Sequence, residues 1–496
     1  MQKDVSIKRI NNFEYSFAHS TARGIKAVAK ALTFKNPSSF AYNKNIEKFD
    51  KRRFSFRIGM LPTLLSVLDT EKITYDLIDY VYKLPNNVVI DDRMSGNYVH
   101  QRKAVEAFYK HRFGIIVVPT RGGKTFIASE IVRIFLNTDV GNFLFLTDNT
   151  TLHTQAVNDI KSYFERYGGI EVGEIRAGKI DLSHRVTVGM IQTIQSTLSN
   201  RCTDKNKKHE LKKYLKELAF LCIDEIHDNC SDSKLKLYKK CRKLEYQLCL
   251  SATPYRSGQF VQNLKLKAWS GDIIYNISEQ TLRQRHVLSD YQVFMLMIDH
   301  NNIDYGDIIE DYDNLRKALI FNSKIRNEAL IRLINMFQER GLKTLVLFQS
   351  VEHGSKISSL TRYKFISGIT RSAEREEIKE GFLKESGGVL LASNIFKKGV
   401  TLPQVEVLIN ADEGLEDANT IQRKGRVLGT TEDKRRSLVI DFFDIYDLYF
   451  SEHSRTRLDT YIDSIGEDNV TILDISVDSW AEELGKCVDK WFECKT

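Results

Sequence analysis

Residues 118–125, Val-Pro-Thr-Arg-Gly-Gly-Lys-Thr, constrain the fold of this chain more than any other stretch. The apolar residues 114–118 predict a buried strand, and residues 126–135 have helical periodicity. A strand, a glycine-bearing loop ending in Gly-Lys-Thr and a helix are the context that a phosphate-binding loop requires. The stretch therefore predicts an α/β domain with a nucleoside triphosphate site beyond the end of a strand.

The residues of this loop have distinct expected roles. Because Gly122 and Gly123 have no Cβ atom, the backbone can curl and direct its N–H groups at a phosphate, and the helix N-terminus adds partial positive charge. Lys124 would neutralise the β- and γ-phosphates, and the hydroxyl of Thr125 would hold Mg²⁺. The sequence thus predicts ATP and Mg²⁺ as cofactors, although Val118 stands where the pattern usually opens on Gly or Ala.

Residues 220–227, Phe-Leu-Cys-Ile-Asp-Glu-Ile-His, form the second informative stretch. Four apolar residues predict a strand, and two adjacent carboxylates follow at its end. Asp224 is placed to bind Mg²⁺, directly or through water, and Glu225 to orient and deprotonate the attacking water. His227 is expected to couple the nucleotide site to a nucleic-acid site. A charge cluster at a helix start would look the same in isolation, but the position after a phosphate-binding loop favours catalysis.

Polar residues at other predicted element ends extend these sites. Gln101 begins a helix upstream of the loop and could place its amide on the adenine edge. Thr150 and Thr151 offer donors to a nucleic-acid phosphate at a helix start, although ordinary capping explains the same residues. The small hydroxyl residues Ser251 and Thr253 follow another strand and could link the acidic loop to the second half of the chain.

Residues 420–426 place Gln422, Arg423 and Arg426 within about one helical turn. Two guanidinium groups directed from a second domain at the triphosphate would form an arginine-finger arrangement. Basic residues on an exposed helix are the plainer interpretation of the same pattern.

Basic residues are most evident before the phosphate loop in residues 49–57. Lys51, Arg52, Arg53 and Arg57 are interleaved with phenylalanines, a combination that suits phosphate contact together with base or sugar stacking. A strand with a solvated cationic face explains the pattern equally well.

Composition bounds the remaining possibilities. Of the 496 residues, 42% are hydrophobic and 28% charged, so cores can be filled and wholesale disorder is not expected. No apolar run of about eighteen residues and no apolar signal core are present, so neither a membrane span nor export is expected. The seven cysteines form no Cys-x-x-Cys pair, which indicates reduced thiols in a cytoplasm and no zinc site. The net charge of +8 is compatible with a polyanionic partner.

Apolar strands alternate with helical segments in both halves of the chain, which predicts parallel sheets covered by helices on both faces. The length suggests about three domains. We expect an N-terminal accessory domain of residues 1–95, an ATP-binding domain of residues 96–285, a second α/β domain of residues 286–450 and a helical tail of residues 451–496, docked by its tryptophans.

The ordered motifs resemble those of the superfamily 2 helicases. The matching positions are Gln101 and residues 118–125, 224–227, 251–253, 348–354, 392–399 and 422–426. Within the superfamily, residues 54–62, 348–354, 365–368 and 422–428 are similar to UvsW-like branch-migration helicases of phages.

The resemblance implies two RecA-like domains in tandem with ATP between them, preceded by a small α+β DNA-binding domain. It also implies an inchworm motor that moves 3′-to-5′ on branched DNA. We expect the protein to be a monomer. It further assigns nucleotide contacts to Thr120, Arg121 and Gly399, and nucleic-acid contacts or coupling to Gln192, Gln349, Ser367, Gly368 and Ser393.

Two departures from the family pattern stand out. Arg121 occupies a place where many relatives have Gly, and Gly429 replaces the second arginine that ends the Gly-Arg motif. Because one expected finger is missing, Arg426 is the leading candidate for its role, with Arg423 assisting and Arg435 or Arg436 as more remote substitutes.

The main functional hypothesis is an ATP-dependent remodeller of branched DNA that acts in recombination, repair and replication in the cytoplasm of a phage host. A duplex-translocating motor subunit of a restriction-type system and an RNA helicase are the alternatives from enzyme chemistry. A degenerate ATPase that serves as a DNA-binding scaffold gains support only from Gly429.

Overall fold

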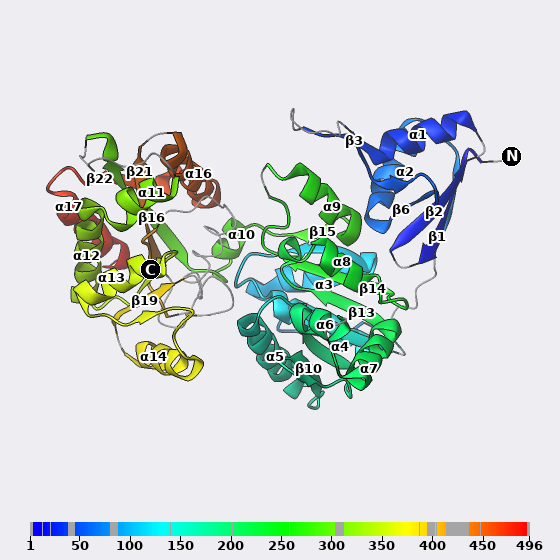
Figure 1. Cartoon of the computed structure of the whole chain (residues 1–496), viewed down its shortest axis with the longest axis horizontal. Coiled ribbons are helices and arrows are strands. Elements are labelled where there is room, and N and C mark those ends of the chain that lie inside the picture. Colours follow the sequence, from blue (N-terminus) through cyan, green and yellow to red (C-terminus); the bar gives the residue numbers. More distant parts are fainter. Residues whose placement is uncertain are drawn as a thin grey trace. The chain divides into compact units, whose positions relative to one another are not determined.

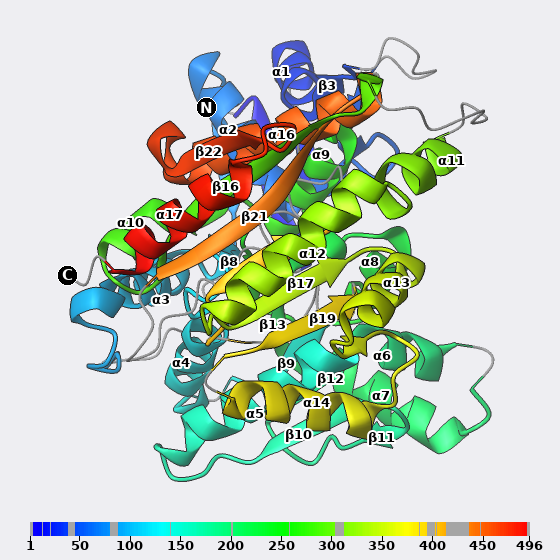
Figure 2. The same cartoon turned by 90° about the vertical axis from the view of Figure 1, so that its left-hand side faces the viewer.

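The computed structural model describes residues 3–11, 13–19, 21–37, 45–79, 88–138, 140–199, 202–256, 258–302, 312–385, 387–393, 402, 404–412, 436–446 and 448–493. The chain divides into two compact units, one of residues 1–119 and 123–277 and the other of residues 120–122 and 278–496. Figures 1 and 2 show the chain from two perpendicular directions. None of the helices in the described ranges combines the length and the apolar character needed to cross a membrane.

The first unit begins with a small α+β accessory domain (Figure 1). Its main sheet has the strand order β5-β6-β2-β1-β7, and α1 and α2 share its apolar core. Buried and exposed residues alternate along most of β1, as expected for a strand with one face on a core. The elements are β1 (Val5–Asn11), β2 (Glu14–His19), α1 (Ala22–Leu32), β3 (Thr33–Lys35), β4 (Asn45–Glu47), β5 (Phe49–Asp50), β6 (Ser55–Arg57), α2 (Leu61–Thr70) and β7 (Tyr75–Ile78).

An eight-stranded sheet forms the rest of the first unit, in the order β11-β10-β12-β9-β13-β14-β8-β15. Its pairings are parallel except between β10 and β11. The strands are β8 (Phe113–Val117), β9 (Asn142–Thr147), β10 (Val172–Arg176), β11 (Lys179–Ile180), β12 (Val186–Met190), β13 (Leu218–Ile223), β14 (Tyr246–Ser251) and β15 (Ile273–Asn276).

Helices cover both faces of this sheet. Along β9, Phe143 and Phe145 face α4 and α5, whereas Leu144 and Leu146 share a core with α6, α7 and α8. Strands buried on both faces are a property of parallel sheets, and the prediction from continuous apolar runs is confirmed. The helices are α3 (Val99–His111), α4 (Lys124–Leu136), α5 (Thr150–Glu165), α6 (Ile191–Leu198), α7 (Lys205–Glu217), α8 (Asp232–Tyr238) and α9 (Phe260–Ser270).

The accessory domain and the eight-stranded sheet share a core through α9. Leu264 and Ala268 belong to the apolar cluster of the accessory domain, and the ring of Phe13 lies 5.6 Å from that of Trp269. A Cβ atom on Gly59 would lie 1.9 Å from the carbonyl oxygen of Lys267, so only glycine permits this approach. The two parts are therefore fitted together without a spacer.

The second unit contains a seven-stranded parallel sheet in the order β18-β19-β17-β20-β21-β16-β22. Residues of α12, α13 and α17 share one core with the strands, and α12 and α17 run alongside the sheet in Figure 2. The strands are β16 (Asp290–Asp299), β17 (Thr344–Phe348), β18 (Phe365–Ile366), β19 (Val389–Ser393), β20 (Val407–Asn410), β21 (Arg436–Ile445) and β22 (Val470–Asp474). The helices are α10 (Glu279–Gln284), α11 (Tyr312–Arg316), α12 (Lys324–Glu339), α13 (Val351–Thr361), α14 (Ser372–Lys384), α16 (Leu448–Ile465) and α17 (Trp480–Glu493).

The C-terminal segment is integral to this sheet. Trp480 is buried in its core, and Nε1 of Trp491 donates to the carbonyl oxygen of Ser437 at 3.1 Å, so the prediction that these tryptophans dock the tail is confirmed. The segment is not purely helical, however, because β22 pairs with β16. The expected boundary after residue 450 also falls inside α16.

Candidate active site

Three neighbouring strands carry the predicted catalytic motifs. β13, β14 and β8 are adjacent in the first sheet and parallel. Residues 118–125 follow β8, residues 224–227 follow β13, and Ser251 ends β14. Because the carboxyl ends of parallel strands meet at one edge, the motifs converge there, the usual location of a ligand site in an open α/β sheet.

The phosphate-binding loop has the backbone that its glycines predict. Gly123 caps α4 with φ of 92°, a left-handed conformation that favours glycine. A Cβ atom there would lie 2.3 Å from Nε2 of Gln101, which is 6% exposed. The fold thus brings Gln101 against the loop. Its contact with adenine, like the nucleotide contacts of Thr120 and Gly122, stays a prediction.

Lys124 and Glu225 form an ion pair, with Nζ of the lysine 2.8 Å from Oε1 of the carboxylate. Glu225 has φ of 44° and ψ of 59°, a left-handed conformation that is strained for a residue with a side chain. Burial alone would raise the pKa of Glu225, but the ammonium group of Lys124 holds it below its ordinary value. Glu225 is therefore ionised, as a general base requires.

The donor set fits ATP and Mg²⁺. Oε2 of Glu225 is buried and accepts no hydrogen bond from the described residues, so it is available to receive a proton from water. Burial raises the pKa of Asp224 to about 7, Glu225 acts in the same direction, and Lys124 opposes both. A divalent cation beside Asp224 would favour its ionised form. With Thr125, Asp224 would hold the metal.

His227 contacts the strand-end serine predicted to couple the two halves of the chain. Its Nδ1 lies 2.9 Å from Oγ of Ser251, and that oxygen accepts the N–H of Thr253 at 3.1 Å. Burial lowers the pKa of His227, so the imidazole is neutral. The same Nδ1 lies 3.4 Å from Oε2 of Glu225, and Nε2 lies 3.6 Å from Oδ2 of Asp228, so the imidazole stands between the two carboxylates and the serine.

A chain of hydrogen bonds that sequence reasoning missed runs from α6 to the catalytic loop. Nε2 of Gln192 donates to Oδ1 of Asp148 at 3.0 Å, and Nζ of Lys234 donates to the same oxygen at 2.6 Å. Lys234 also donates to Oδ1 of Asn229 at 2.8 Å. The buried Asn229 then donates to the carbonyl oxygens of Asp224 at 2.6 Å and Glu225 at 3.1 Å.

This relay fixes the strained backbone at Glu225 and ties it to the loop before α5. Neither Asn229 nor Lys234 belongs to any of the sequence motifs described above. The only signal in the sequence is that two polar residues, Asn229 and Lys234, follow the catalytic carboxylates at short spacing.

Two of the predicted nucleic-acid contacts begin α5. Asn149 caps this helix, because its Oδ1 accepts the N–H of Leu152 at 2.9 Å. Thr150 is exposed and Thr151 half-buried, and neither side chain is the cap. Capping is thus supplied by their neighbour, and phosphate contact by the two threonines stays a prediction.

The basic residues of the accessory domain separate into two environments. Lys51, Arg52 and Arg53 are exposed in the turn between β5 and β6. The guanidinium group of Arg57 instead pairs with Glu14 at 2.6 Å and lies 4.3 Å from the ring centroid of Trp269. Arg57 therefore helps to join the accessory domain to α9, which the sequence did not indicate.

In the second unit, Oε1 of Gln349 accepts a hydrogen bond from Arg316 at 2.8 Å. Ser367 and Ser393 are 6% and 4% exposed, whereas Gly368 is exposed in the loop after β18. Their contacts with nucleic acid stay predictions. Gly399, Gln422, Arg423, Arg426 and Gly429 lie outside the described residues.

Arg436 makes its contacts within the second unit. It begins β21, its Nη1 donates to the carbonyl oxygen of Trp491 at 2.6 Å, and its guanidinium group lies 4.8 Å from the centroid of that ring. These contacts hold Arg436 at the start of the strand, and its role as a substitute finger stays a prediction.

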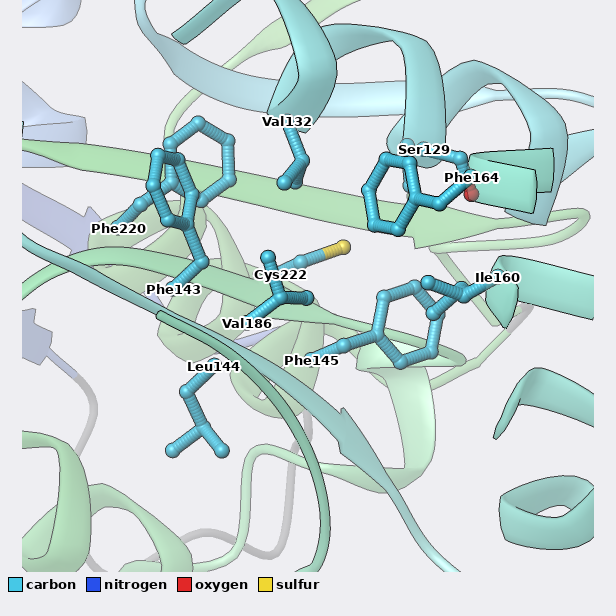
Figure 3. Close-up of a pocket in the computed structure, with 11 residues that line it drawn as sticks. Ser129, Val132, Phe143, Leu144, Phe145, Ile160, Phe164, Val186, Phe220 and Cys222 are labelled. Atoms are coloured by element: carbon cyan, nitrogen blue, oxygen red, sulfur yellow. The ribbon is translucent and has the colours of Figure 1, made fainter. Parts of the chain in front are cut away.

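A closed apolar cavity lies behind the phosphate-binding loop, between α4, α5 and the sheet (Figure 3). Its volume of about 10 Å³ is near the minimum that one water needs. The polar atom at its edge, Oγ of Ser129, already donates to the carbonyl oxygen of Thr125 at 2.8 Å. The cavity is a packing gap in the core rather than a ligand site.

Comparisons with known proteins agree with this geometry. Residues 95–256 match the family described as the res subunit of type III restriction enzymes, and residues 325–428 match the helicase conserved C-terminal domain. Together these segments cover just over half of the chain.

A protein of Sulfolobus islandicus filamentous virus that is described as a helicase is 22% identical over 82% of this chain and 70% of its own length. The ATP-dependent DNA helicase uvsW of Enterobacteria phage T4 is 22% identical over 70% of this chain and 68% of its own length. The structure of S. cerevisiae Dbp5 bound to RNA and ADP BeF3 has a TM-score of 0.54 at 15% identity, over 79% of this chain and 92% of that chain. At that identity the likeness concerns the fold, two RecA-like domains in tandem.

Proposed function

The chain belongs to the superfamily 2 helicases, and we propose that it is an ATP-driven motor that remodels branched DNA such as forks, Holliday junctions and displacement loops. The observation that supports the motor is the ion pair of Lys124 with Oε1 of Glu225, whose other oxygen, Oε2, is buried and accepts no hydrogen bond from the described residues. The choice of DNA is supported by the similarity to the phage T4 DNA helicase. Exposed cations on a domain fused to the motor support an additional DNA contact.

The described residues divide the reaction as follows. ATP, bound with Mg²⁺, would supply the phosphoanhydride bond whose hydrolysis drives movement. The backbone of Gly122 and Gly123 and the ammonium group of Lys124 bind and orient the phosphates. Asp224 and Thr125 would hold the metal, and Oε2 of Glu225 would take the proton of the attacking water.

The coupling of hydrolysis to DNA is proposed to pass through two routes. His227 contacts Ser251 at the end of β14, and Asn229 links the backbone of Glu225 to Lys234 and Asp148. Arg426, assisted by Arg423, would stabilise the transition-state charge from the second RecA-like domain. We further propose that the protein acts as a monomer in the cytoplasm of a phage host, in recombination, repair and replication.

One assay tests the proposal directly. ATP hydrolysis is measured side by side with single-stranded DNA, unbranched duplex, fork, four-way junction and RNA, with Lys124→Ala as the inactive control. We expect branched DNA to stimulate turnover most, and the same junctions to be unwound in an ATP-dependent way. Equal stimulation by unbranched duplex would favour a restriction-type translocase, and stronger stimulation by RNA would favour an RNA helicase.

A further inference from the structure

Cations from two parts of the first unit meet where the accessory domain joins the motor sheet. Both Arg57 of the accessory domain and Lys239, directly after α8, lie over the indole of Trp269. The guanidinium carbon of Arg57 is 4.3 Å from the ring centroid, and Nζ of Lys239 is 5.7 Å from it. We call the group the seam cluster, and its members are Lys48, Arg53, Arg57, Lys236, Lys239 and Lys265.

Carboxylates neutralise only part of this cluster. Glu14 pairs with Arg57 at 2.6 Å, and Asp232 pairs with Lys265 at 2.6 Å. Asp50 lies 3.9 Å from Arg53, at the limit of an ion pair. Among the described residues, no carboxylate lies within ion-pair distance of the other three members, which are Lys48, Lys236 and Lys239. The seam therefore keeps an excess of positive charge.

The electrostatic interactions cross the seam. The pKa of Lys239 is lowered, and burial is the largest cause. The nearby cations Arg57, Arg53 and Lys236 lower it further, whereas Glu14 raises it. The pKa of Lys48 is likewise lowered, by burial and then by Lys265. A lowered lysine pKa means that the surroundings disfavour the charged form. The shared core through α9 thus holds like charges together at a cost that a polyanion would relieve.

We propose that the seam cluster binds the sugar-phosphate backbone of duplex DNA, so that one duplex arm contacts the accessory domain and the first RecA-like domain together. The proposal rests on the proposed action on DNA and adds a second contact, away from the strand ends that carry the catalytic motifs. It assigns DNA contacts to Lys236 and Lys239, which lie outside the helicase motifs described above.

Duplex fits the cluster better than a single strand does. Sites for single strands combine cations with aromatic rings on which bases stack. Here the central ring, Trp269, is only 8% exposed, because the cations and Phe13 cover it. Phe54, half-exposed beside Arg53, packs edge-on against Phe17 and His19. A duplex turns its phosphates outward and needs no stacking surface.

The test uses the full chain with the double substitution Lys236→Ala and Lys239→Ala. Affinity for an unbranched DNA duplex is measured over a series of salt concentrations. Each lost phosphate contact lowers the slope of log K against log salt by roughly one unit, so we expect a slope smaller by about two. Adding Arg53→Ala, on the accessory side, should lower it by about one more, because the same duplex spans both sides.

A matched control removes the same charge from α7 by Lys205→Ala with Lys212→Ala, two exposed lysines outside the seam cluster. The control pair should change the slope by less than one unit. The midpoint of thermal unfolding without DNA should be unchanged or higher in the seam variant, because repulsion between cations is removed. A lower midpoint would show that the two lysines are structural and would overturn the proposal.

The remaining outcomes separate this inference from the proposed function. The seam assignment fails, and the proposed function stands, if the wild-type protein binds duplex DNA and the seam variant has the same salt slope. The same conclusion follows if the control pair lowers the slope as much as the seam pair does. If the substitutions reduce the affinity for single-stranded DNA or for duplex RNA more than that for duplex DNA, that nucleic acid is the ligand of the seam cluster instead. If the wild-type protein binds no DNA, the proposed function fails as well.

Discussion

Nζ of Lys124 lies 2.8 Å from Oε1 of Glu225, so the residue expected to bind phosphate and the residue expected to activate water are paired with each other. The two side chains are only 11% and 16% exposed. Because the ammonium group cannot serve a carboxylate and a triphosphate equally, phosphate would draw Lys124 away from Glu225. The pKa of Glu225, which Lys124 holds down, would then rise, and a carboxylate of higher pKa is a stronger base. The pair would thus delay base activation until ATP is bound.

Glu225→Gln should bind ATP and fail to hydrolyse it. An amide cannot accept the proton of water, so kcat with junction DNA should fall roughly a hundredfold or more. The Kd for ATP should stay the same or decrease, because Lys124 no longer has a carboxylate partner. Steady-state kinetics and nucleotide binding measure both, with Glu171→Gln on an exposed carboxylate as the control. Near wild-type turnover would remove Glu225 as the base.

Lys234→Met should uncouple hydrolysis from DNA. The side chain connects Asp148 and Asn229, and through Asn229 it connects to the backbone of Glu225. Substitutions in such a network change coupling by about 0.5–2 kcal/mol, so the ratio of DNA-stimulated to unstimulated turnover should fall roughly 2- to 30-fold. Lys234→Arg should restore part of the ratio, and Lys216→Met, an exposed lysine of α7, should leave it unchanged. If both rates fall in the same proportion, the role is structural.

Asp444 should make the stability of the second unit sensitive to acid. Its carboxylate accepts from Arg326 and, at 2.9 Å, from His300, all buried. Burial alone would raise the pKa of Asp444, but Arg326 and then His300 hold it below its ordinary value. A carboxyl group with a lowered folded pKa adds stability above its unfolded pKa of about 3.9, and this stability is lost as pH falls through the folded pKa.

Asp444→Asn should therefore lower the midpoint of thermal unfolding strongly near pH 7 and much less at a pH below the folded pKa of Asp444. At neutral pH the substitution leaves the buried guanidinium group of Arg326 without a counter-charge, a change that costs about 3–5 kcal/mol. Thermal melts across this pH range measure it, with the exposed Asp478→Asn as the control. An equal decrease of the unfolding midpoint at both pH values would show that the substitution acts through packing rather than through the loss of charge.

Arg426→Ala should reduce kcat with junction DNA while the affinity for ATP stays within a few-fold. A transition-state finger contributes on the order of a thousandfold to phosphoryl transfer, and Gly429 cannot supply one. Gly429→Arg should change little if Arg426 already fills the place. Full turnover of the Arg426→Ala enzyme would exclude this residue as the finger.

Local patterns were sufficient to predict the fold class and the strand-end motifs. The apolar run before Gly122 could only be a buried strand in that context, and the glycine at position 123 has the positive φ that the loop needs. Ser251 and the acidic loop were expected to share a coupling role, and the structure adds that their strands are neighbours and that His227 contacts Ser251.

Partners chosen by tertiary packing were not predictable. Arg57 has the same basic character in the sequence as Arg53, yet it pairs with Glu14 and Trp269 because β6 lies beside β2 and faces α9. Asn229 lies in an irregular loop, where only the folded backbone shows which carbonyl groups it reaches. The tail was expected to be helical, whereas residues 470–474 form a strand because they pair with β16.

The fit of Gly59 against the carbonyl oxygen of Lys267 has a consequence for anyone who shortens this protein. In a chain that begins near residue 90, the removal of the accessory domain would also change the surface of the motor domain. The shortened chain would expose the apolar side chains of Leu264, Ala268 and Trp269 of α9 to water, and such a surface promotes self-association. Loss of activity after such a deletion would report damage to the motor as much as loss of a DNA contact. Substitutions of single surface residues are therefore a better test of the function of the accessory domain than its deletion.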